Sequence, residues 1–363
     1  MTTFDLLLVG FGHVAQRFVT LLEEQRRPLA REHGISARVV GIVTRRHGQA
    51  HAARGLNAPA LARRAARGQA IGAAAGAQSA LESIGSAAKT SAATRDGRLV
   101  VVETTTLDIA RGQPAIDHVR AALTGGAHVI TANKGPVAFA YHALARTAVR
   151  ARRRFLFEGA VMDGIPIFNL VRETLPAVTI LGFRGVVNST TNYILTAMEA
   201  GQPFAEALAE MQGAGIAEAD ASLDVDGWDA AAKTAALANV LLDARLTPHT
   251  VERQGITAAI GPRAMAARAA GRRLKLVARA GRDARRVSAR VAPEELPEDD
   301  LLAGLEGQQN AIVFHTDLLG EIAVVQRGGG LTQTAYALLS DLITLSRGGG
   351  EVSGRPPARR ARA

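Results

Sequence analysis

A glycine-containing turn near the N-terminus constrains the fold of this chain more than any other feature. Residues 4–9 are apolar enough for a buried strand, and the apolar spacing over residues 14–22 predicts an amphipathic helix. Between them stands Gly10-Phe-Gly-His-Val-Ala15, where the first glycine permits a tight turn and the alanine lets helix and strand touch. This strand–turn–helix order predicts the start of a parallel α/β sheet.

The expected elements that follow extend this unit into a doubly wound fold. We expect strands at 38–43, 99–102, 129–130 and 155–157, with helices at 114–124 and 136–150. The sequence therefore predicts a Rossmann-type nucleotide-binding domain over residues 1–157. Residues 48–97 are rich in Ala and Arg and are expected to form helical or loosely ordered surface excursions.

A different rhythm of elements begins after residue 157. Expected helices lie at 165–174, 190–199, 203–213 and 227–243, and expected strands at 178–187, 286–292, 310–315 and 321–326. This order predicts an α+β domain over 158–326 that binds substrate and forms a dimer. A final helix within 327–347 is expected to return to the nucleotide domain, and residues 348–363 are expected to be disordered.

Composition excludes several classes of function. The chain has 363 residues and a net charge of +10. It contains no cysteine, which excludes disulfides and thiolate chemistry. Its basic residues are not interleaved with aromatic residues, which make up only 4%, so we expect no nucleic-acid partner. No stretch approaches the ~20 apolar residues that span a bilayer, so we expect no membrane partner and a cytoplasmic location.

The glycine turn also predicts a dinucleotide site. Backbone at the second glycine can approach a pyrophosphate, and the helix N-terminus offers unpaired N–H groups to the phosphates. The expected contacts are Gly10, Phe11, Gly12, His13, Val14 and Ala15. A glycine turn that binds no ligand is the alternative.

The end of the second strand bears on which dinucleotide binds. An NAD-selective site has an acid there for the ribose hydroxyls, but this strand is followed by Arg45 and Arg46. Two guanidinium groups would attract a 2′-phosphate, so we expect NADP(H) in preference to NAD(H). A chance pair in an arginine-rich chain is the alternative.

Residues 218–233 hold five carboxylates and a lysine before an alanine-rich helix. Asp229 and Lys233 are four residues apart, so their side chains project to one side of that helix. A surface ion pair would explain these two residues alone. It would not explain the spacing of the whole segment.

That spacing, E-x-D-x-x-x-D-x-D-G-x-D-x-x-x-K, resembles the signature of homoserine dehydrogenases, and the resemblance extends over roughly residues 4–347. It implies a reversible NAD(P)-dependent interconversion of L-homoserine and L-aspartate 4-semialdehyde, a step of threonine and methionine biosynthesis. It also implies a homodimer. We expect no ACT-type regulatory domain and hence no allosteric control by threonine.

The resemblance further implies roles for individual residues. Lys233 would be the acid/base, with Lys134 and Asp229 as further catalytic residues, and the substrate would be bound by Glu218, Asp224 and Thr190. Additional cofactor contacts would be Thr104, Thr105, Lys134 and Gly330. A monovalent cation, Na⁺ or K⁺, would be held by Glu158, Val161, Asp163 and Ile165. From the residues alone, the threonines could equally be local caps and the last segment an ordinary hinge.

Two other functions compete with this hypothesis. Another NAD(P)-dependent oxidoreductase could share the glycine turn, but would not require the spacing of residues 218–233. A basic, nucleotide-sensing DNA-binding regulator could explain the charge. It would not explain the cluster of acids and lysine, and it would need a recognition helix that the sequence does not show.

Overall fold

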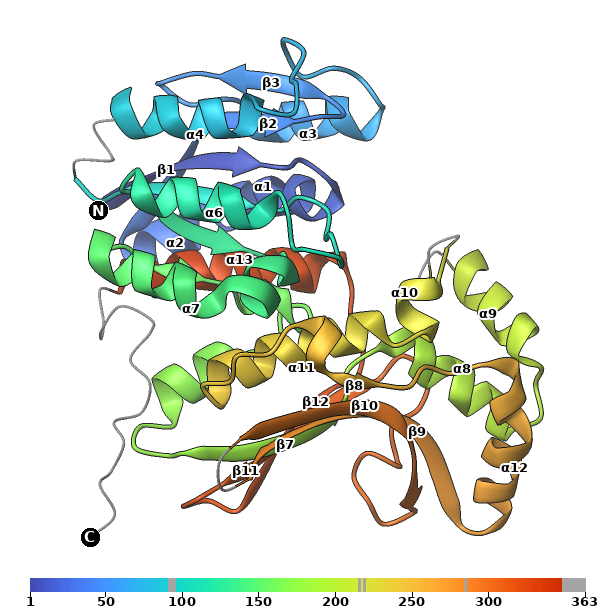
Figure 1. Ribbon diagram of the computed structural model, residues 1–363. Helices are drawn as coiled ribbons and strands as arrows, with labels where there is room; N and C mark the ends of the chain where they lie inside the picture. The colour runs from blue at the N-terminus through green and yellow to red at the C-terminus, as the bar shows by residue number, and fades with distance from the viewer. Residues whose placement is uncertain (91–95, 215–216, 218–219, 284–285, 348–363) are drawn as a thin grey trace, which may run out of the picture. The chain divides into compact units, whose positions relative to one another are not determined.

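The computed structural model describes residues 1–90, 96–214, 217, 220–283 and 286–347 (Figure 1). Glu218 and the tail for which we predict disorder, residues 348–363, lie outside the described residues. The chain divides into two compact units. Unit 1 is Met1–Asn169 together with the chain from Gly330 onward, and unit 2 is Leu170–Gly329.

Unit 1 contains a six-stranded sheet in the order β3-β2-β1-β4-β5-β6. Its strands are β1 (Thr2–Val9), β2 (Ile35–Thr44), β3 (Gly48–His51), β4 (Leu99–Glu103), β5 (His128–Thr131) and β6 (Phe155–Leu156). All neighbours are parallel except β3, which pairs antiparallel with β2. The predicted doubly wound α/β class is confirmed.

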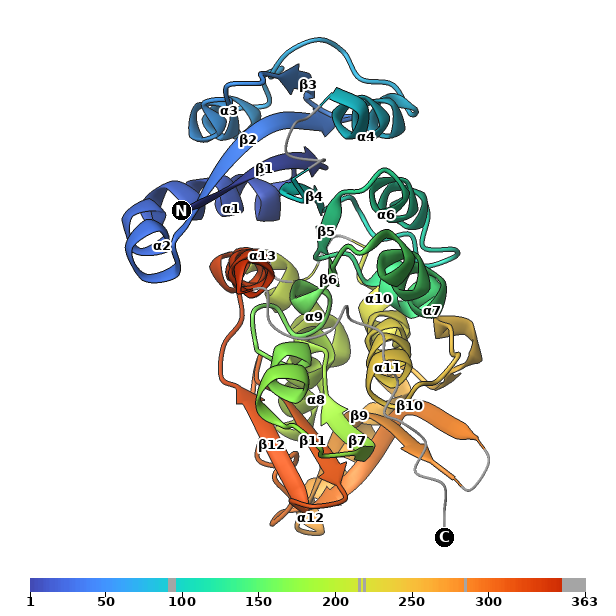
Figure 2. The ribbon, with the colours of Figure 1, turned by 90° about the vertical axis from the view of Figure 1, so that its left-hand side faces the viewer.

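Helices cover both faces of this sheet (Figure 2). They are α1 (His13–Glu24), α2 (Arg26–His33), α3 (Ala58–Ala66), α4 (Ser79–Thr90), α6 (Ala115–Thr124), α7 (Lys134–Ala151), the 3₁₀ turn η1 (Glu158–Ala160) and α13 (Leu331–Ser346). The alternate residues Leu6 and Leu8 of β1 pack in one cluster with Phe18 of α1 and Leu338 of α13. Each such buried side chain contributes about 1.5–3 kcal/mol, so the last helix is part of the core of unit 1.

The Ala/Arg-rich segment contains three regular elements in its described part: β3, α3 and α4. The side chain of Asn57 caps α3 by accepting the N–H of Ala60 at 3.1 Å. Three alanines of α3, at positions 58, 62 and 65, are buried in the core cluster. The packing face of α3 thus consists of alanines at helical spacing. Sequence analysis did not identify it because the segment has few large apolar residues.

Unit 2 contains a mixed sheet in the order β12-β11-β7-β9-β10-β8. Its strands are β7 (Ile180–Val186), β8 (Glu252–Arg253), β9 (Arg272–Arg282), β10 (Val287–Pro297), β11 (Asn310–Thr316) and β12 (Glu321–Gln326). Its helices are α8 (Ser189–Glu199), α9 (Phe204–Gly213), α10 (Ser222–Val225), α11 (Trp228–Leu241) and α12 (Gly261–Ala269), with short turns η2 (Leu170–Thr174), η3 (Pro248–Thr250) and η4 (Ala258–Ile260). Helices α8, α11 and α12 pack against β9 (Figure 1).

Several elements differ from the sequence expectation. Strand β9 was not predicted, because Lys275 interrupts its apolar pattern; its side chain is nonetheless fully buried. Helices α2 and α12 were also not predicted. The helix expected at 165–174 begins only at residue 168, and most of it is the π-helical turn η2.

Within the described part of the chain, no helix combines the length and the apolar character needed to cross a membrane.

Candidate active site

The glycine turn lies where β1 ends, beside the end of β4. Gly10 has φ +90°, and a Cβ atom there would lie 2.7 Å from the main-chain carbonyl of Thr104. The turn is held on both sides, since Gly10 N donates to Val43 O at 2.9 Å and Thr104 N donates to Val9 O at 2.8 Å. Glycine is required at position 10 both by this conformation and by the close approach of the next strand.

The start of α1 fits a bound phosphate. A Cβ atom at Gly12 would meet no protein atom within 4 Å, and no side chain caps the helix there. The first amides of an uncapped helix have no partner within the helix, and the positive end of the helix dipole strengthens their attraction for an anion. Phe11 and Ala15 are buried in the core, so their side chains support the turn from behind, while His13 is exposed and Val14 partly buried.

A buried carboxylate connects the ends of β4 and β5. Glu103 is fully buried, and its Oε1 accepts the N–H of Thr105 at 3.0 Å as well as the Thr105 hydroxyl. Its Oε2 accepts the hydroxyl of Thr131 at 2.8 Å. Glu103 thereby orients the threonine turn, a role that sequence analysis did not assign to it. The only signal was a charged residue ending an apolar strand.

Asn133 continues this network into the helix that begins with Lys134. Its Nδ2 donates to Thr105 O at 2.9 Å, and its Oδ1 accepts the N–H of Gly135 at 2.8 Å as the cap of α7. Lys134 is thus held at the first position of a helix at the carboxyl edge of the sheet. This is the edge where open α/β sheets bind ligands.

Three other predicted cofactor contacts belong to unit 1. Arg45 and Arg46 are exposed in the turn between β2 and β3, and that turn contains no acidic residue. Gly330 precedes α13 with extended backbone at φ 168°. Its conformation does not require glycine.

The predicted cation segment also lies in unit 1. The carboxylate of Glu158 is buried and accepts three main-chain N–H groups, from Ile167 at 2.5 Å, Phe168 at 2.9 Å and Asn169 at 2.7 Å. Asp163 has φ 53° and accepts the hydroxyl of Thr334 at 3.0 Å. Three N–H donors take up most of the acceptor capacity of the Glu158 carboxylate, which makes it a poorer cation ligand than a carboxylate without such donors. The described residues contain no cluster of three or more His or acidic side chains that could hold a metal ion.

Unit 2 brings together four of the residues in and around its acid-rich segment. Lys233 Nζ lies 2.8 Å from Asp229 Oδ2 and donates to Val187 O at 2.7 Å. Asn188 Nδ2 donates to Asp224 Oδ1 at 2.7 Å and to Asp229 Oδ2 at 3.0 Å. Asn188, Asp224, Asp229 and Lys233 are called the acid–lysine cluster below. Sequence analysis predicted three of its members and missed Asn188.

The local fold explains why these side chains converge. Gly227, at φ 80°, turns the chain between α10 and α11 and so brings Asp224 beside the first turn of α11. Helix α11 buries a run of alanines, which lets it approach the sheet closely. Asp229 and Lys233, one turn apart, share its other side, and their side chains are each 15% exposed.

The electrostatics of the cluster act most strongly on Asp224. Burial, followed by the negative charge of Asp229, raises the pKa of Asp224 above its ordinary value. Hydrogen bonds from Asn188 and Thr190 and the charge of Lys233 oppose this shift. Thr190 is itself buried and therefore belongs to the surroundings of the cluster.

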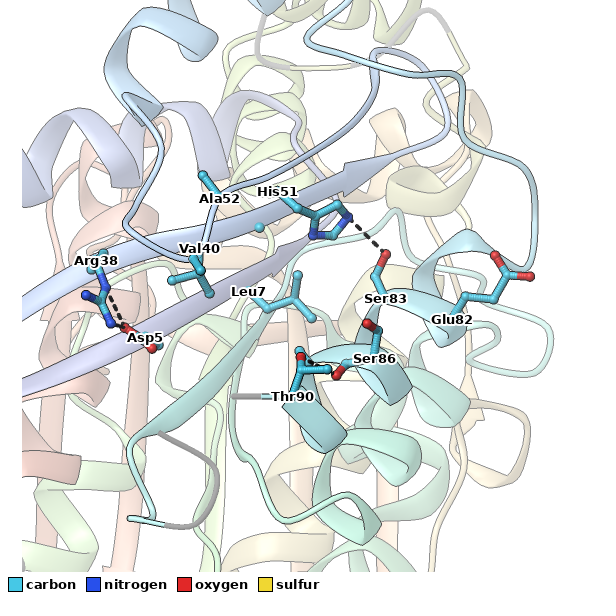
Figure 3. A pocket seen from close by; sticks show the side chains of 13 residues that line it. Asp5, Leu7, Arg38, Val40, His51, Ala52, Glu82, Ser83, Ser86 and Thr90 are labelled. Carbon is cyan, nitrogen blue, oxygen red and sulfur yellow. Dashed lines mark hydrogen bonds and ion pairs between the residues drawn. The ribbon is translucent and has the colours of Figure 1, made fainter. Parts of the chain in front are cut away.

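Unit 1 also contains a cavity of about 680 Å³ between α4 and strands β1 and β2 (Figure 3). Four of its polar side chains form two pairs: Arg38 Nη2 lies 2.7 Å from Asp5 Oδ1, and the Ser83 hydroxyl lies 3.4 Å from His51 Nε2. None of its lining residues is a predicted site residue. The cavity therefore adds nothing to the candidate active site.

Comparison with protein families gives two matches that together cover most of the chain. Residues 10–158 match the model for the NAD-binding domain of homoserine dehydrogenase, and residues 166–343 match the homoserine dehydrogenase model. Neither competing hypothesis, another oxidoreductase or a DNA-binding regulator, is favoured by these matches.

Individual relatives agree with the family models. The NAD(+)-dependent homoserine dehydrogenase of Pseudomonas canavaninivorans is 39% identical over 345 residues, which is 94% of this chain and 96% of the relative. The homoserine dehydrogenase of Methanocaldococcus jannaschii is 40% identical over 245 residues, 67% of this chain and 71% of the relative. The crystal structure of a putative homoserine dehydrogenase from Archaeoglobus fulgidus superposes with a TM-score of 0.82 at 30% identity, covering 94% of this chain and 99% of the other. The chain therefore belongs to the homoserine dehydrogenase family of NAD(P)-dependent oxidoreductases.

Proposed function

We propose that the two units divide the work of interconverting L-homoserine and L-aspartate 4-semialdehyde. Unit 1 binds the dinucleotide through the glycine turn and the amides at the start of α1. Unit 2 binds the amino acid through the acid–lysine cluster. The observation that carries this proposal is the hydrogen-bonded series Asp224–Asn188–Asp229–Lys233, because it combines carboxylates for an ammonium group with a lysine for proton transfer.

Substrate binding follows from the charges of a zwitterionic amino acid. Its ammonium group requires a carboxylate when it leaves water, and Asp224 is the partly buried carboxylate that accepts a hydrogen bond from Thr190. We assign the ammonium to Asp224 and a polar substrate contact to Thr190. Glu218 remains a further predicted acid of this site.

Lys233 is the proposed acid/base. A nicotinamide cofactor, when bound, would supply the acceptor for the hydride that C4 of homoserine loses on oxidation. The residue role that we assign is proton transfer: the neutral amine of Lys233 would take the proton of the alcohol. In the reverse direction the ammonium form of Lys233 returns that proton to the aldehyde oxygen. Asp229, 2.8 Å away, stabilises the ammonium form and holds the side chain in place. Lys134, at the start of α7, is the proposed second lysine.

We propose NADP(H) as the preferred cofactor. Arg45 and Arg46 are exposed where β2 ends, and that turn has no acid that would repel a 2′-phosphate. Gly330, Thr104 and Thr105 are proposed as further contacts. The name of the relative from Pseudomonas canavaninivorans supports NAD(H) instead. A comparison of kcat/KM for NADPH and NADH with aspartate semialdehyde decides between the two.

The monovalent cation remains a prediction. If Na⁺ or K⁺ binds, main-chain carbonyls of Val161, Asp163 and Ile165 are better candidates than the Glu158 carboxylate, which already accepts three N–H groups. Activity in KCl, NaCl and choline chloride at equal ionic strength tests this prediction.

We propose that unit 2 forms a homodimer. Four exposed apolar side chains lie on β7, on β12 and in the turn between β11 and β12: Leu181, Leu318, Leu319 and Val325. β12 is also an edge strand of the sheet. Light scattering during size-exclusion chromatography measures the mass directly. The cytoplasmic location expected from the sequence likewise remains a prediction.

The proposed function is tested by following nicotinamide absorbance with aspartate semialdehyde and each reduced cofactor. We expect oxidation of the cofactor that depends on the semialdehyde, with L-homoserine as the product by chromatography. A protein that binds the dinucleotide but converts neither L-homoserine nor the semialdehyde would refute the proposal.

A further inference from the structure

Asn188 connects the members of the acid–lysine cluster, although sequence analysis assigned it no role. It lies just before α8 and is 5% exposed. Its amide nitrogen contacts Asp224 Oδ1 at 2.7 Å and Asp229 Oδ2 at 3.0 Å. The preceding residue, Val187, accepts the hydrogen bond from Lys233 Nζ at 2.7 Å. Two consecutive residues thus contact the three predicted members of the acid–lysine cluster.

The orientation of the Asn188 amide is determined by its other end. Its Oδ1 accepts the main-chain N–H of Thr191 at 2.9 Å, as the N-cap of α8. Because a main-chain N–H can only donate, the atom facing Thr191 must be the oxygen. The NH₂ group therefore faces the two carboxylates, and each of its two hydrogens has an anionic acceptor.

The Asn188 amide offsets the electrostatic repulsion between the two neighbouring carboxylates. Asp224 and Asp229 carry like charges and share one neighbour, and Lys233 forms its ion pair with Asp229. A neutral donor between the acids stabilises both without adding a charge that would compete with the ammonium group of a substrate. We propose that Asn188 is a positioning residue of the homoserine site, whose amide holds Asp224 ready for the substrate ammonium and Asp229 ready for Lys233.

The inference rests on the proposed function of this site, and it predicts a pH effect. The charged groups facing Asp224 are Asp229 and Lys233 from α11, while Asn188 and Thr190 face it as neutral donors. Loss of the Asn188 amide removes one of the contributions that lower the pKa of Asp224. Its pKa then moves further up. Protonated Asp224 cannot bind an ammonium group, so the acidic limb of kcat/KM should move to higher pH.

Two variants separate positioning from helix capping. Asn188→Ser keeps an oxygen that can cap α8 but removes the NH₂ group. Asn188→Asp keeps the shape and the cap but places a third carboxylate against the other two. Asn57→Ser is the matched control, because Asn57 caps α3 in the same way and has no carboxylate partner among its hydrogen bonds in the described structure.

We expect kcat/KM for L-homoserine to fall about 10- to 100-fold in Asn188→Ser, mainly through KM, and further in Asn188→Asp. The KM for the cofactor should stay within about twofold, and Asn57→Ser should match the wild type. The acidic limb should move to higher pH in both Asn188 variants and stay in place in Asn57→Ser. L-homoserine binding by calorimetry, measured with the reduced cofactor present so that no turnover occurs, should weaken in parallel.

The outcomes are distinguishable. An active wild type together with an Asn188→Ser variant within twofold of its kcat/KM would overturn the inference alone. So would a large loss of activity with no movement of the acidic limb, since that pattern indicates a purely structural role. A wild type that neither binds nor oxidises L-homoserine would overturn the proposed function and this inference with it.

Discussion

Replacing Lys233 with methionine tests the centre of the proposed mechanism. Methionine keeps much of the length and the apolar stem of lysine but has no group that can exchange a proton. General acid–base catalysis contributes about 10²–10⁴-fold, or about 3–5 kcal/mol of the barrier. We expect kcat to fall by that factor in both directions of the reaction.

The same substitution should leave the fold intact. It removes the ion pair with Asp229 at 2.8 Å and the hydrogen bond to Val187 O at 2.7 Å. A hydrogen bond to a charged group contributes about 1.5–3 kcal/mol, and Asp229 retains its bond from Asn188. The free energy of unfolding should therefore fall by up to about 3 kcal/mol, a loss that a chain of this size tolerates.

Lys233→Arg is the matched variant. A guanidinium group keeps the positive charge beside Asp229 but stays protonated at any working pH. It should preserve stability and still lose kcat. Lys89→Met, at an exposed position in α4, controls for the substitution itself.

Rates are followed by nicotinamide absorbance, cofactor binding by fluorescence and stability by urea unfolding. The decisive result is kcat of Lys233→Met at intact cofactor binding. A value above about a tenth of the wild type would be too high for loss of the acid/base. Lys134 would then become the leading candidate.

Three further predictions follow from local geometry. Replacing Arg45 and Arg46 with alanine should raise the KM for NADPH by about tenfold or more and leave that for NADH nearly unchanged; equal effects on both cofactors would contradict the proposed 2′-phosphate contact. Gly10→Ala should cost about 1–3 kcal/mol of stability because of φ +90° and the nearby Thr104 carbonyl, whereas Gly12→Ala, whose Cβ meets no protein atom, should keep its Tm and lose cofactor affinity. Burial lowers the pKa of Lys275 to about 8 from 10.5, so as the pH rises the folded state loses this proton at a lower pH than the unfolded state. Between these two pKa values the free energy of unfolding of the wild type should therefore rise with pH. Urea unfolding measures this rise, which should be smaller in Lys275→Met.

Much of the fold was predictable because its signals are local. The alternation of short apolar runs with helical periodicity indicated the parallel sheet of unit 1, and the glycine turn fixed where it begins. Strand β9 was not predictable in the same way. Its Lys275 looks like a surface residue in the sequence, but its ammonium group is buried and donates to Asn192 Oδ1 at 3.1 Å and to Leu305 O. That pairing depends on contacts across more than 25 positions of the chain.

The residues of the candidate site likewise differ in whether local sequence spacing could predict them. Asp229 and Lys233 were predictable as a pair because one helical turn separates them. Asn188 was not, because its partners Asp224 and Asp229 lie 36 and 41 positions away. Glu103 was missed for the same reason, since Thr131 is 28 positions away. Sequence spacing reports neighbours on one element, whereas these residues join different elements.

Three asparagines that cap helices in the same way differ in their burial and in their other hydrogen-bond partners. Asn57, Asn133 and Asn188 each accept a main-chain N–H at the start of a helix, so their sequence contexts predict the same structural role. Asn57 is exposed, whereas the other two are 5% exposed.

Burying an amide costs several kcal/mol unless its hydrogens find acceptors, so a buried cap must bind something besides its helix. Asn133 donates to the carbonyl of the threonine turn, and Asn188 donates to two carboxylates. In each case the second partner belongs to a proposed site, one in each unit. The helix start and the site group are therefore held by one side chain, and neither can shift without breaking the other's hydrogen bonds. A capping oxygen alone satisfies the helix, which is why serine at position 188 should preserve the fold while releasing the acids.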